Sequence, residues 1–345
     1  MNWPGPIPKS ALVCALDWGL GHVARTTALV GSLLVAGTRV VLASNGRSAT
    51  WWRSEFPDLE VRELPDYGVR YAKGPWLVPG LLASLPRIAL AIAREKALVA
   101  RWQREESFDL IFSDNRYGCR AKGARSILMT HQLRLAAPRH FERFEGPGER
   151  LVAELVHSFD EVWIPDHQDG IRLSGKMGHP THPAWFPPLR YIGPLSRFAQ
   201  VEPDPAWAGP WDAVALVSGP EPARTSFEER LRNHLRRRPG RHLLVRGRPD
   251  LPAPATESSN ASREVPHLPT PSLASALAGA RQILCRGGYS TVMDLSALGL
   301  LDSRCVFLPT PGQTEQEYLA RHLARTSGCQ ILSESDLESA TASGK

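Results

Sequence analysis

Short apolar runs alternate with longer helix-like segments along the whole chain. In the first half the strand candidates are rich in aliphatic residues, and they span 11–16, 39–44, 59–64, 109–114, 126–130 and 161–165. Helix-like segments separate several of them, notably 23–35 and 86–106. Strand, helix, strand in repetition is typical of a parallel sheet with helices on both faces.

The second half repeats this pattern. Its strand candidates span 212–219, 241–247, 281–288 and 304–310, and its helix candidates span 226–237, 271–280, 289–298 and 315–325. A Pro- and Gly-rich stretch at 191–211 is typical of an interdomain linker, and 249–271 of a surface loop. With 345 residues, we predict an α/β protein with two Rossmann-like, doubly wound domains, 1–195 and 196–345, facing a cleft. Ligand-binding loops then follow the carboxyl ends of the strands.

Composition excludes several classes of protein. The net charge of +6 demands no nucleic-acid partner, and no RNA-binding or zinc-finger motif is present, so we expect no nucleic acid. Five cysteines without C-x-x-C spacing argue against a zinc site or a disulfide framework and favour a reducing compartment. No signal peptide or membrane-spanning stretch is apparent, so we expect a cytoplasmic protein.

The loop DWGLGH follows the first strand directly. Gly19 and Gly21 allow a tight turn close to a ligand, and His22 falls in the first turn of the next helix. A helix N-terminus disfavours the protonated imidazole, which suits a histidine that acts as a base. A glycine-rich turn with a solvent-facing histidine explains the same residues.

The segment GLGHVA also fits the dinucleotide fingerprint G-x-G-x-x-A. That fingerprint expects an acid at the end of the second strand to hold a ribose, and the chain has Ser44 to Arg47 there instead. The missing acid counts against NAD, while Arg47 keeps NADP possible.

Two further loops of the first half carry polar residues at strand ends. Asp114 ends one strand near the same edge as His22, where a carboxylate would fix the tautomer of an imidazole and raise its basicity. A helix cap explains Asp114 equally well. His131 follows the next strand and lines the acceptor side, or is a structural histidine.

The strongest signal in the second half is CRGGYSTVMD. Free amides at a helix start after Gly287 and Gly288 make a ready anion site, with the hydroxyls of Ser290 and Thr291 nearby. Asp294, a turn and a half into the helix, would hold a ribose diol. The alternative is a capped helix with a surface aspartate.

Two other loops add weaker signals. Ser218, Gly219 and Thr225 could offer hydroxyls and amides to phosphate oxygens, although the prolines around them also explain a rigid turn. A polar helix start suited to sugar hydroxyls contains Gln313, Glu315 and Gln316. No D-x-D pair is present, so we predict that no metal is used.

At these loops the sequence resembles the GT-B glycosyltransferases, in particular relatives of the peptidoglycan N-acetylglucosaminyltransferase and the UDP-glucuronosyltransferases. The resemblance places His22 at the catalytic histidine and Asp114 at its aspartate partner. It places Gly288 and Thr291 in the phosphate-binding turn, and Asp294 at a ribose-binding glutamate that is one methylene longer.

The resemblance also implies a reaction. A hexosyl group would move from a nucleoside-diphosphate sugar, a UDP-sugar above all, to a glycan, lipid or small-molecule hydroxyl with inversion and without a cofactor. Gln316 would contact the donor sugar, while Glu315 stands where the family has a second glutamine and leaves the sugar open.

The segment 74–104 combines Trp, Leu and Ile with arginines and a lysine. Such a segment suits peripheral contact with anionic lipid at the inner membrane face and a role in the cell envelope, or a long helix packed on its own sheet. Beside the transferase, two hypotheses remain open: an NADP-dependent oxidoreductase, and a sugar-nucleotide epimerase or binding protein on the same frame.

Overall fold

The strand β1 (Ser10–Ala15) is buried at every position after the first. Ala11 and Val13 pack into one hydrophobic core, while Leu12 and Cys14 pack into another on the opposite face of the sheet. This alternation follows from the two-residue period of a strand. A strand buried on both faces needs helices above and below it, which is the arrangement of parallel sheets.

The computed structural model describes residues 6–17, 20–68, 77–137, 143–199, 201–219, 221–252 and 262–339. The chain divides into two compact units, which we call unit 1 (Met1–Leu195) and unit 2 (Ser196–Lys345). Each unit has a parallel sheet of its own, so each is described separately.

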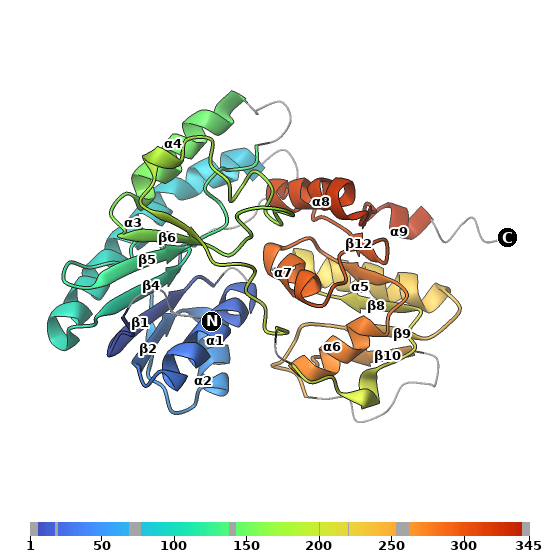
Figure 1. Cartoon of the computed structure of the whole chain (residues 1–345). Coiled ribbons are helices and arrows are strands. Elements are labelled where there is room, and N and C mark those ends of the chain that lie inside the picture. Colours follow the sequence, from blue (N-terminus) through green and yellow to red (C-terminus); the bar gives the residue numbers. More distant parts are fainter. Residues whose placement is uncertain are drawn as a thin grey trace. The chain divides into compact units, whose positions relative to one another are not determined.

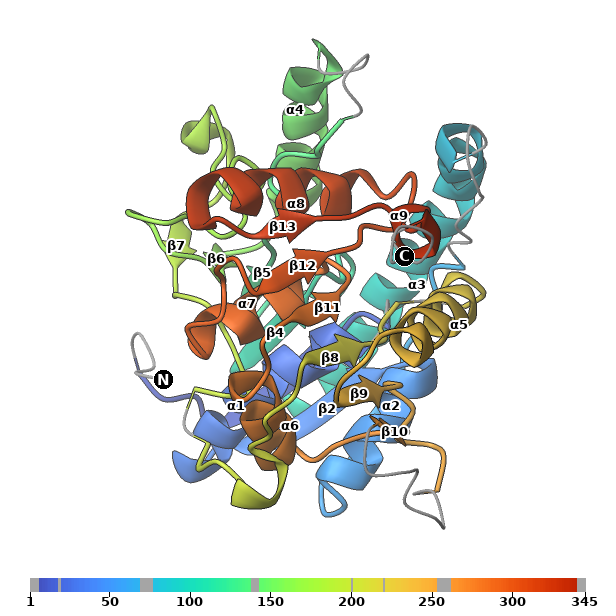
Figure 2. The same ribbon diagram turned by 90° about the vertical axis from the view of Figure 1, so that its right-hand side faces the viewer.

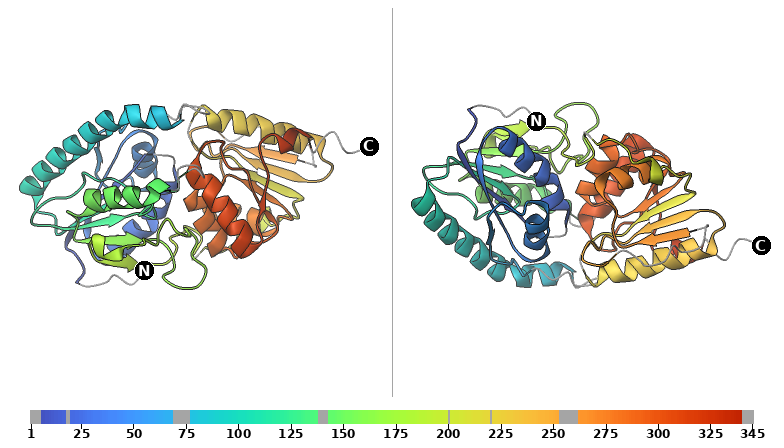
Figure 3. Two further views of the ribbon diagram at one scale, coloured as in Figure 1. Left: turned by 90° about the horizontal axis from the view of Figure 1, so that it is seen from above. Right: turned by 90° about the horizontal axis from the view of Figure 1, so that it is seen from below.

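Unit 1 contains a seven-stranded sheet within its described residues, in the order β3-β2-β1-β4-β5-β6-β7. Its other strands are β2 (Arg39–Ser44), β3 (Val61–Glu63), β4 (Leu110–Asp114), β5 (Arg125–Met129), β6 (Glu161–Ile164) and β7 (Leu189–Tyr191). Its helices are α1 (Leu20–Val35), α2 (Gly46–Glu55), α3 (Leu77–Glu106) and α4 (Glu145–Val156), with a 3-10 turn at Pro183–Trp185. Helices α1 and α2 pack on one face and α3 and α4 on the other (Figures 1 and 3).

Unit 2 contains a six-stranded sheet in the part of the chain that is described, in the order β10-β9-β8-β11-β12-β13. Its strands are β8 (Ala213–Leu216), β9 (His242–Val245), β10 (Ser262–Val265), β11 (Ile283–Cys285), β12 (Cys305–Phe307) and β13 (Gln330–Ile331). Its helices are α5 (Ala223–Arg237), α6 (Thr270–Ala278), α7 (Tyr289–Ala297), α8 (Thr314–Ser327) and α9 (Asp336–Ser339), with a 3-10 turn at Pro205–Trp207. Figure 2 shows α5 on one face of this sheet and α6 and α7 on the other. The predicted fold class, α/β with two doubly wound parallel sheets, is confirmed.

Both sheets reverse their winding at one point. In unit 1 the chain moves outward from β1 through β2 to β3 and then returns to place β4 beside β1. In unit 2 the same reversal places β11 beside β8. Loops at the carboxyl ends of the strands that flank such a reversal are the usual ligand sites of open α/β sheets. The loops after β1, β4, β8 and β11 are therefore the expected ligand-binding loops.

The sequence pattern missed three strands. The edge strands β7 and β13 are only three and two residues long. Strand β10 falls inside the predicted surface loop 249–271, so that prediction is wrong at 262–265, where SREV pairs with β9. Short edge strands form by pairing with a neighbour and lack a long apolar run of their own. Helix α3 also begins nine residues before the predicted start at Pro86, and this proline lies inside the helix.

Candidate functional site

The side chains of His22 and Asp114 meet at the reversal point of unit 1. Asp114 is the last residue of β4 and lies opposite Ala15, the last residue of β1. His22 lies in the first turn of α1, which follows β1. The His22 Nδ1 atom is 3.0 Å from the Asp114 Oδ1 atom. The two residues that sequence reasoning paired are therefore in contact.

A third side chain, that of Arg25, completes this group. Arg25 lies one helical turn after His22 and is 2% exposed. Its Nε donates to Asp114 Oδ2 at 2.6 Å, and its NH2 group donates to Asp114 Oδ1. The same NH2 group lies 2.9 Å from His22 Nδ1. We call these three residues the His22 cluster.

The Asp114 carboxylate is ionised in this cluster. Burial by itself raises the pKa of Asp114, but the Arg25 guanidinium and then His22 outweigh burial and lower that pKa to about 2. A buried carboxylate that keeps its charge needs partners of this kind. His22 is partly exposed, with 14% of its side chain accessible, so its ring can meet a ligand.

Sequence reasoning missed Arg25, although a signal for it exists. The spacing H-x-x-R places both side chains on one face of a helix, and α1 carries no other cation. An isolated arginine on a helix that packs against a sheet indicates a buried acidic partner. Asp114 is that partner.

A second buried ion pair holds the loops around the His22 cluster. The Arg116 side chain is fully buried and pairs with the Glu95 carboxylate of α3. Arg116 also donates to the carbonyl oxygens of Ala15 at 2.8 Å and Pro65 at 3.0 Å, and to the side chain of Asn45. One guanidinium thus joins the carboxyl end of β1 to the segments that follow β2, β3 and β4.

The remaining predicted acceptor-side residues have different surroundings. His131 follows β5 and is buried, with 3% exposure. Gly21 lies in the first turn of α1, while Gly19 falls outside the described residues. The acceptor role of these residues stays a prediction.

The start of α2 is occupied by a carboxylate of the chain itself. Asp17 accepts hydrogen bonds from the backbone amides of Arg47 at 3.3 Å and Ser48 at 3.2 Å, and from the Ser48 hydroxyl at 2.7 Å. An NADP 2′-phosphate placed beside Arg47 would meet this negative charge. The arrangement therefore disfavours the NADP alternative.

The start of α7 is different, because among the described residues no carboxylate accepts hydrogen bonds from its first amides. Its N-cap residue, Gly288, has no side chain that could cap the helix, and the first turn contains no acid. A Cβ placed on Gly288 would meet no atom within 4 Å. Ser290 and Thr291 are partly exposed, and among the described residues none forms a hydrogen bond with either hydroxyl. Amides and hydroxyls at this helix start are available to an anion.

Asp294 lies further along α7, and its carboxylate contacts the first residues of unit 2. Oδ1 accepts from the Ser196 hydroxyl at 2.6 Å, and Oδ2 lies 3.7 Å from the Arg197 Nε. Burial raises the pKa of Asp294, although Arg197 and Ser196 act in the opposite direction. A ribose diol would have to share this carboxylate with Ser196, so the predicted ribose contact stays a prediction.

The loop after β8 is closed by its own residues. Glu221 accepts from the Thr225 amide at 3.2 Å and from the Thr225 hydroxyl at 2.8 Å. Gly219 has a φ of +108°, and a Cβ there would lie 2.9 Å from an Arg286 nitrogen. The donor role of Ser218, Gly219 and Thr225 stays a prediction, and the negative charge of Glu221 weighs against a phosphate at this position.

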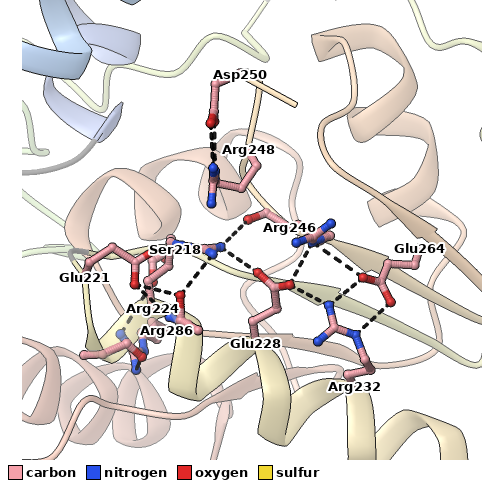
Figure 4. Close-up of polar contacts among 12 residues, drawn as sticks. Ser218, Glu221, Arg224, Glu228, Arg232, Arg246, Arg248, Asp250, Glu264 and Arg286 are labelled. Carbon is pink, nitrogen blue, oxygen red and sulfur yellow. Dashed lines mark hydrogen bonds and ion pairs between the residues drawn. The ribbon is translucent and has the colours of Figure 1, made fainter. Parts of the chain in front are cut away.

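Figure 4 shows the ion-pair network that holds this loop against its neighbours. The Glu228 carboxylate accepts from Arg224 at 2.8 Å, from Arg246 at 2.7 Å and from Arg232 at 2.5 Å. Arg286, which follows β11, donates to the Ala223 carbonyl at 3.0 Å. These arginines are engaged with protein groups that join β9, β11 and α5.

The loop after β12 is organised by one glutamine. The buried Gln316 side chain accepts from the Thr310 amide at 2.9 Å and donates to the side chain of Gln313. Glu315 is half-buried beside it. Gln316 therefore shapes the loop, and the sugar contacts predicted for Gln313, Glu315 and Gln316 stay predictions.

Helix α3 contains most of the segment 74–104, of which residues 74–76 lie outside the described residues. Leu85 and Leu90 on this helix are 50% and 52% exposed, and Arg87 and Arg94 are exposed beside them. No helix within the described residues is long and apolar enough to span a bilayer. The described residues also include no group of three or more side chains placed to hold a metal. The predicted lipid contact stays a prediction.

No family model and no curated protein matches the chain. Solved structures match over nearly its full length. The glycotransferase of kitacinnamycin covers 98% of this chain and 90% of its own, at 17% identity and a TM-score of 0.64. The chain has the GT-B fold.

Two more structures with the GT-B fold are similar. MurG of Acinetobacter baumannii covers 96% of this chain and 88% of its own, at 15% identity and a TM-score of 0.56. UGT89C1 of Arabidopsis thaliana, complexed with UDP-L-rhamnose, covers 97% and 90%, at 13% identity and a TM-score of 0.59. The predicted GT-B architecture is confirmed.

The depressed pKa of Asp114 predicts a pH dependence of stability. A pKa lowered from 3.8 to about 2 on folding means that ionised Asp114 stabilises the fold fully above about pH 4, and that this contribution is lost as the pH falls through about 2. One pKa unit corresponds to about 1.4 kcal/mol, so the contribution is about 2 kcal/mol. Denaturant unfolding of the wild type and Asp114→Asn at about pH 5 and about pH 2 measures it.

The stability difference between these two proteins should be smaller at the lower pH by that amount. A difference that is the same at both pH values contradicts the assignment. Asp58→Asn, which removes an exposed carboxylate, is the matched control.

Proposed function

We propose that the chain is a glycosyltransferase. It moves a hexosyl group from a nucleoside-diphosphate sugar, a UDP-sugar in the first instance, to the hydroxyl of a glycan, lipid or small-molecule acceptor. The observation that supports this most strongly is the uncapped start of α7, where the space beside Gly288 is open and the first turn contains no acid. The structural neighbour with UDP-L-rhamnose bound gives a precedent for such a donor on this fold.

Under this proposal the start of α7 holds the diphosphate. The backbone amides of residues 289–291 donate to phosphate oxygens, and the hydroxyls of Ser290 and Thr291 add further donors. The partial positive charge of the helix start stabilises the negative charge that develops on the leaving nucleoside diphosphate. This arrangement requires no metal ion. Gln313 and Glu315 would contact the hydroxyls of the donor sugar.

His22 acts on the acceptor. With Nδ1 on Asp114, the Nε2 atom is left to face a substrate hydroxyl and to take its proton. The deprotonating oxygen attacks the anomeric carbon while the bond from that carbon to the diphosphate oxygen breaks on the opposite face. The products are an inverted glycoside, a nucleoside diphosphate and a protonated His22, which releases its proton to solvent.

The proposal is tested by a panel of nucleotide sugars and acceptors, with release of nucleoside diphosphate as the readout. We expect release that depends on an acceptor, and a thermal stabilisation of the protein by UDP but not by NADP. Stabilisation by NADP instead, together with no release from any donor, would favour the oxidoreductase.

Gly288→Val tests the phosphate site itself. Gly288 has a φ of −68°, which any residue adopts, and a Cβ there meets no atom within 4 Å, so the variant should fold normally. Its methyl groups would occupy the space next to the α7 amides, and we expect UDP to bind at least about tenfold more weakly in calorimetry. Gly146→Val, also at an open position, is the control. Unchanged affinity in Gly288→Val would place the phosphates elsewhere.

His22→Ala separates a transferase from a binding protein. We expect a loss of transfer of about 10²- to 10⁴-fold, the usual contribution of a general base, with UDP affinity retained. The exposed His157→Ala serves as the control. Full transfer activity in His22→Ala would contradict the role of this histidine.

A further inference from the structure

Arg25 stands out because it contacts both members of the proposed catalytic pair. Its side chain is almost completely buried, and its Nε and NH2 groups donate hydrogen bonds to the Asp114 carboxylate. The NH2 nitrogen also lies 2.9 Å from His22 Nδ1. An arginine nitrogen has no lone pair to offer and can only donate.

Two arrangements of the His22 ring are consistent with these contacts. In one, Nδ1 carries a proton and donates to Asp114. In the other, Nδ1 is bare and accepts from Arg25. Nδ1 cannot do both at once. Only the first arrangement leaves Nε2 bare, as the proposed transfer step requires, because a neutral ring with a bare Nδ1 carries its proton on Nε2.

The doubly protonated ring fits this environment less well. Its added positive charge would lie beside that of Arg25, whose NH2 nitrogen is 2.9 Å from Nδ1. The Asp114 charge, which in a simple Asp–His pair would favour the imidazolium, is already paired with Arg25. Among the described residues, the charged groups in contact with His22 are Asp114 on β4 and Arg25 on α1.

We propose that Arg25 is a positioning residue that keeps His22 neutral by pairing with Asp114 and by placing its own positive charge beside the ring. A bare Asp–His pair would hold a proton on His22 to higher pH. Arg25 thus widens the pH range in which His22 can accept a proton. The catalytic part of this inference rests on the proposed function, while the effect on His22 itself does not.

Histidine NMR tests the effect on the ring without any assumption about activity. Protein with isotope-labelled histidine is titrated, and the His22 signal is assigned by its absence in His22→Gln. We expect the His22 midpoint in Arg25→Gln to lie higher than in the wild type by about one pH unit or more. Arg53→Gln, which removes an exposed arginine on α2, should leave it unchanged. An unchanged midpoint in Arg25→Gln overturns the proposal.

Arg25→Gln could fail to fold because Asp114 loses its partner, so the effect of Arg25 is also measured in variants that lack the Asp114 charge. Asp114→Asn is compared with the double variant Asp114→Asn/Arg25→Gln, which leaves no unpaired charge behind. The proposal expects the His22 midpoint to rise when Arg25 is removed in this background as well. Equal midpoints in the two variants overturn it.

The pH profile of transfer then connects the ring to catalysis. If the chain is a transferase, the acid limb of kcat/KM for Arg25→Gln should move to higher pH by the same amount as the NMR midpoint. A drop in activity at all pH values with no movement of the limb would assign Arg25 a purely structural role. If no transfer is found for the wild type, the proposed function fails while the NMR result still decides the role of Arg25.

Discussion

The buried charge of Asp114 is the constraint around which the candidate site of unit 1 is built. A carboxylate at the end of an inner strand, with no exposure to water, keeps its charge only if cations and donors surround it. Arg25 and His22 supply them from one face of α1. The position of the His22 ring follows from this requirement, because the helix that presents it must also bring Arg25 to Asp114.

The helix start of α7 differs from those of α2 and α5. The starts of α2 and α5 receive carboxylates from the chain itself, Asp17 and Glu221. The start of α7 has a glycine cap, two hydroxyl residues and no acid. Capping by an internal carboxylate uses the same amides and the same helix dipole that would bind a phosphate. The contrast therefore points to α7 rather than to α2 or α5 as the place for an anionic ligand.

Most of the fold could be predicted from the sequence, because buried parallel strands appear as apolar runs separated by helices. The strands β7, β10 and β13 were not predicted, because they are short edge strands that depend on pairing with a neighbour. The contact between His22 and Asp114 could be anticipated, since Asp114 ends one predicted strand and His22 follows the end of another. That β1 and β4 are neighbours is a property of the tertiary fold.

Other features of the site depended on contacts between residues far apart in the sequence. Arg25 belongs to the cluster only because α1 lies against the end of β4. Asp294 is not simply open to a ribose, because the Ser196 hydroxyl reaches it from the start of unit 2. The Thr225 hydroxyl donates a hydrogen bond to Glu221, which belongs to no recognisable sequence motif. In each case a polar side chain contacts a residue that the sequence pattern does not identify.

The central claim is that the open start of α7 binds the diphosphate of a nucleotide. A crystal structure of the chain with UDP tests this most directly. The account predicts that phosphate oxygens lie within hydrogen-bond distance of the backbone nitrogens of residues 289–291. A diphosphate bound at the start of α1 or α5, with the α7 amides facing only water, would contradict it.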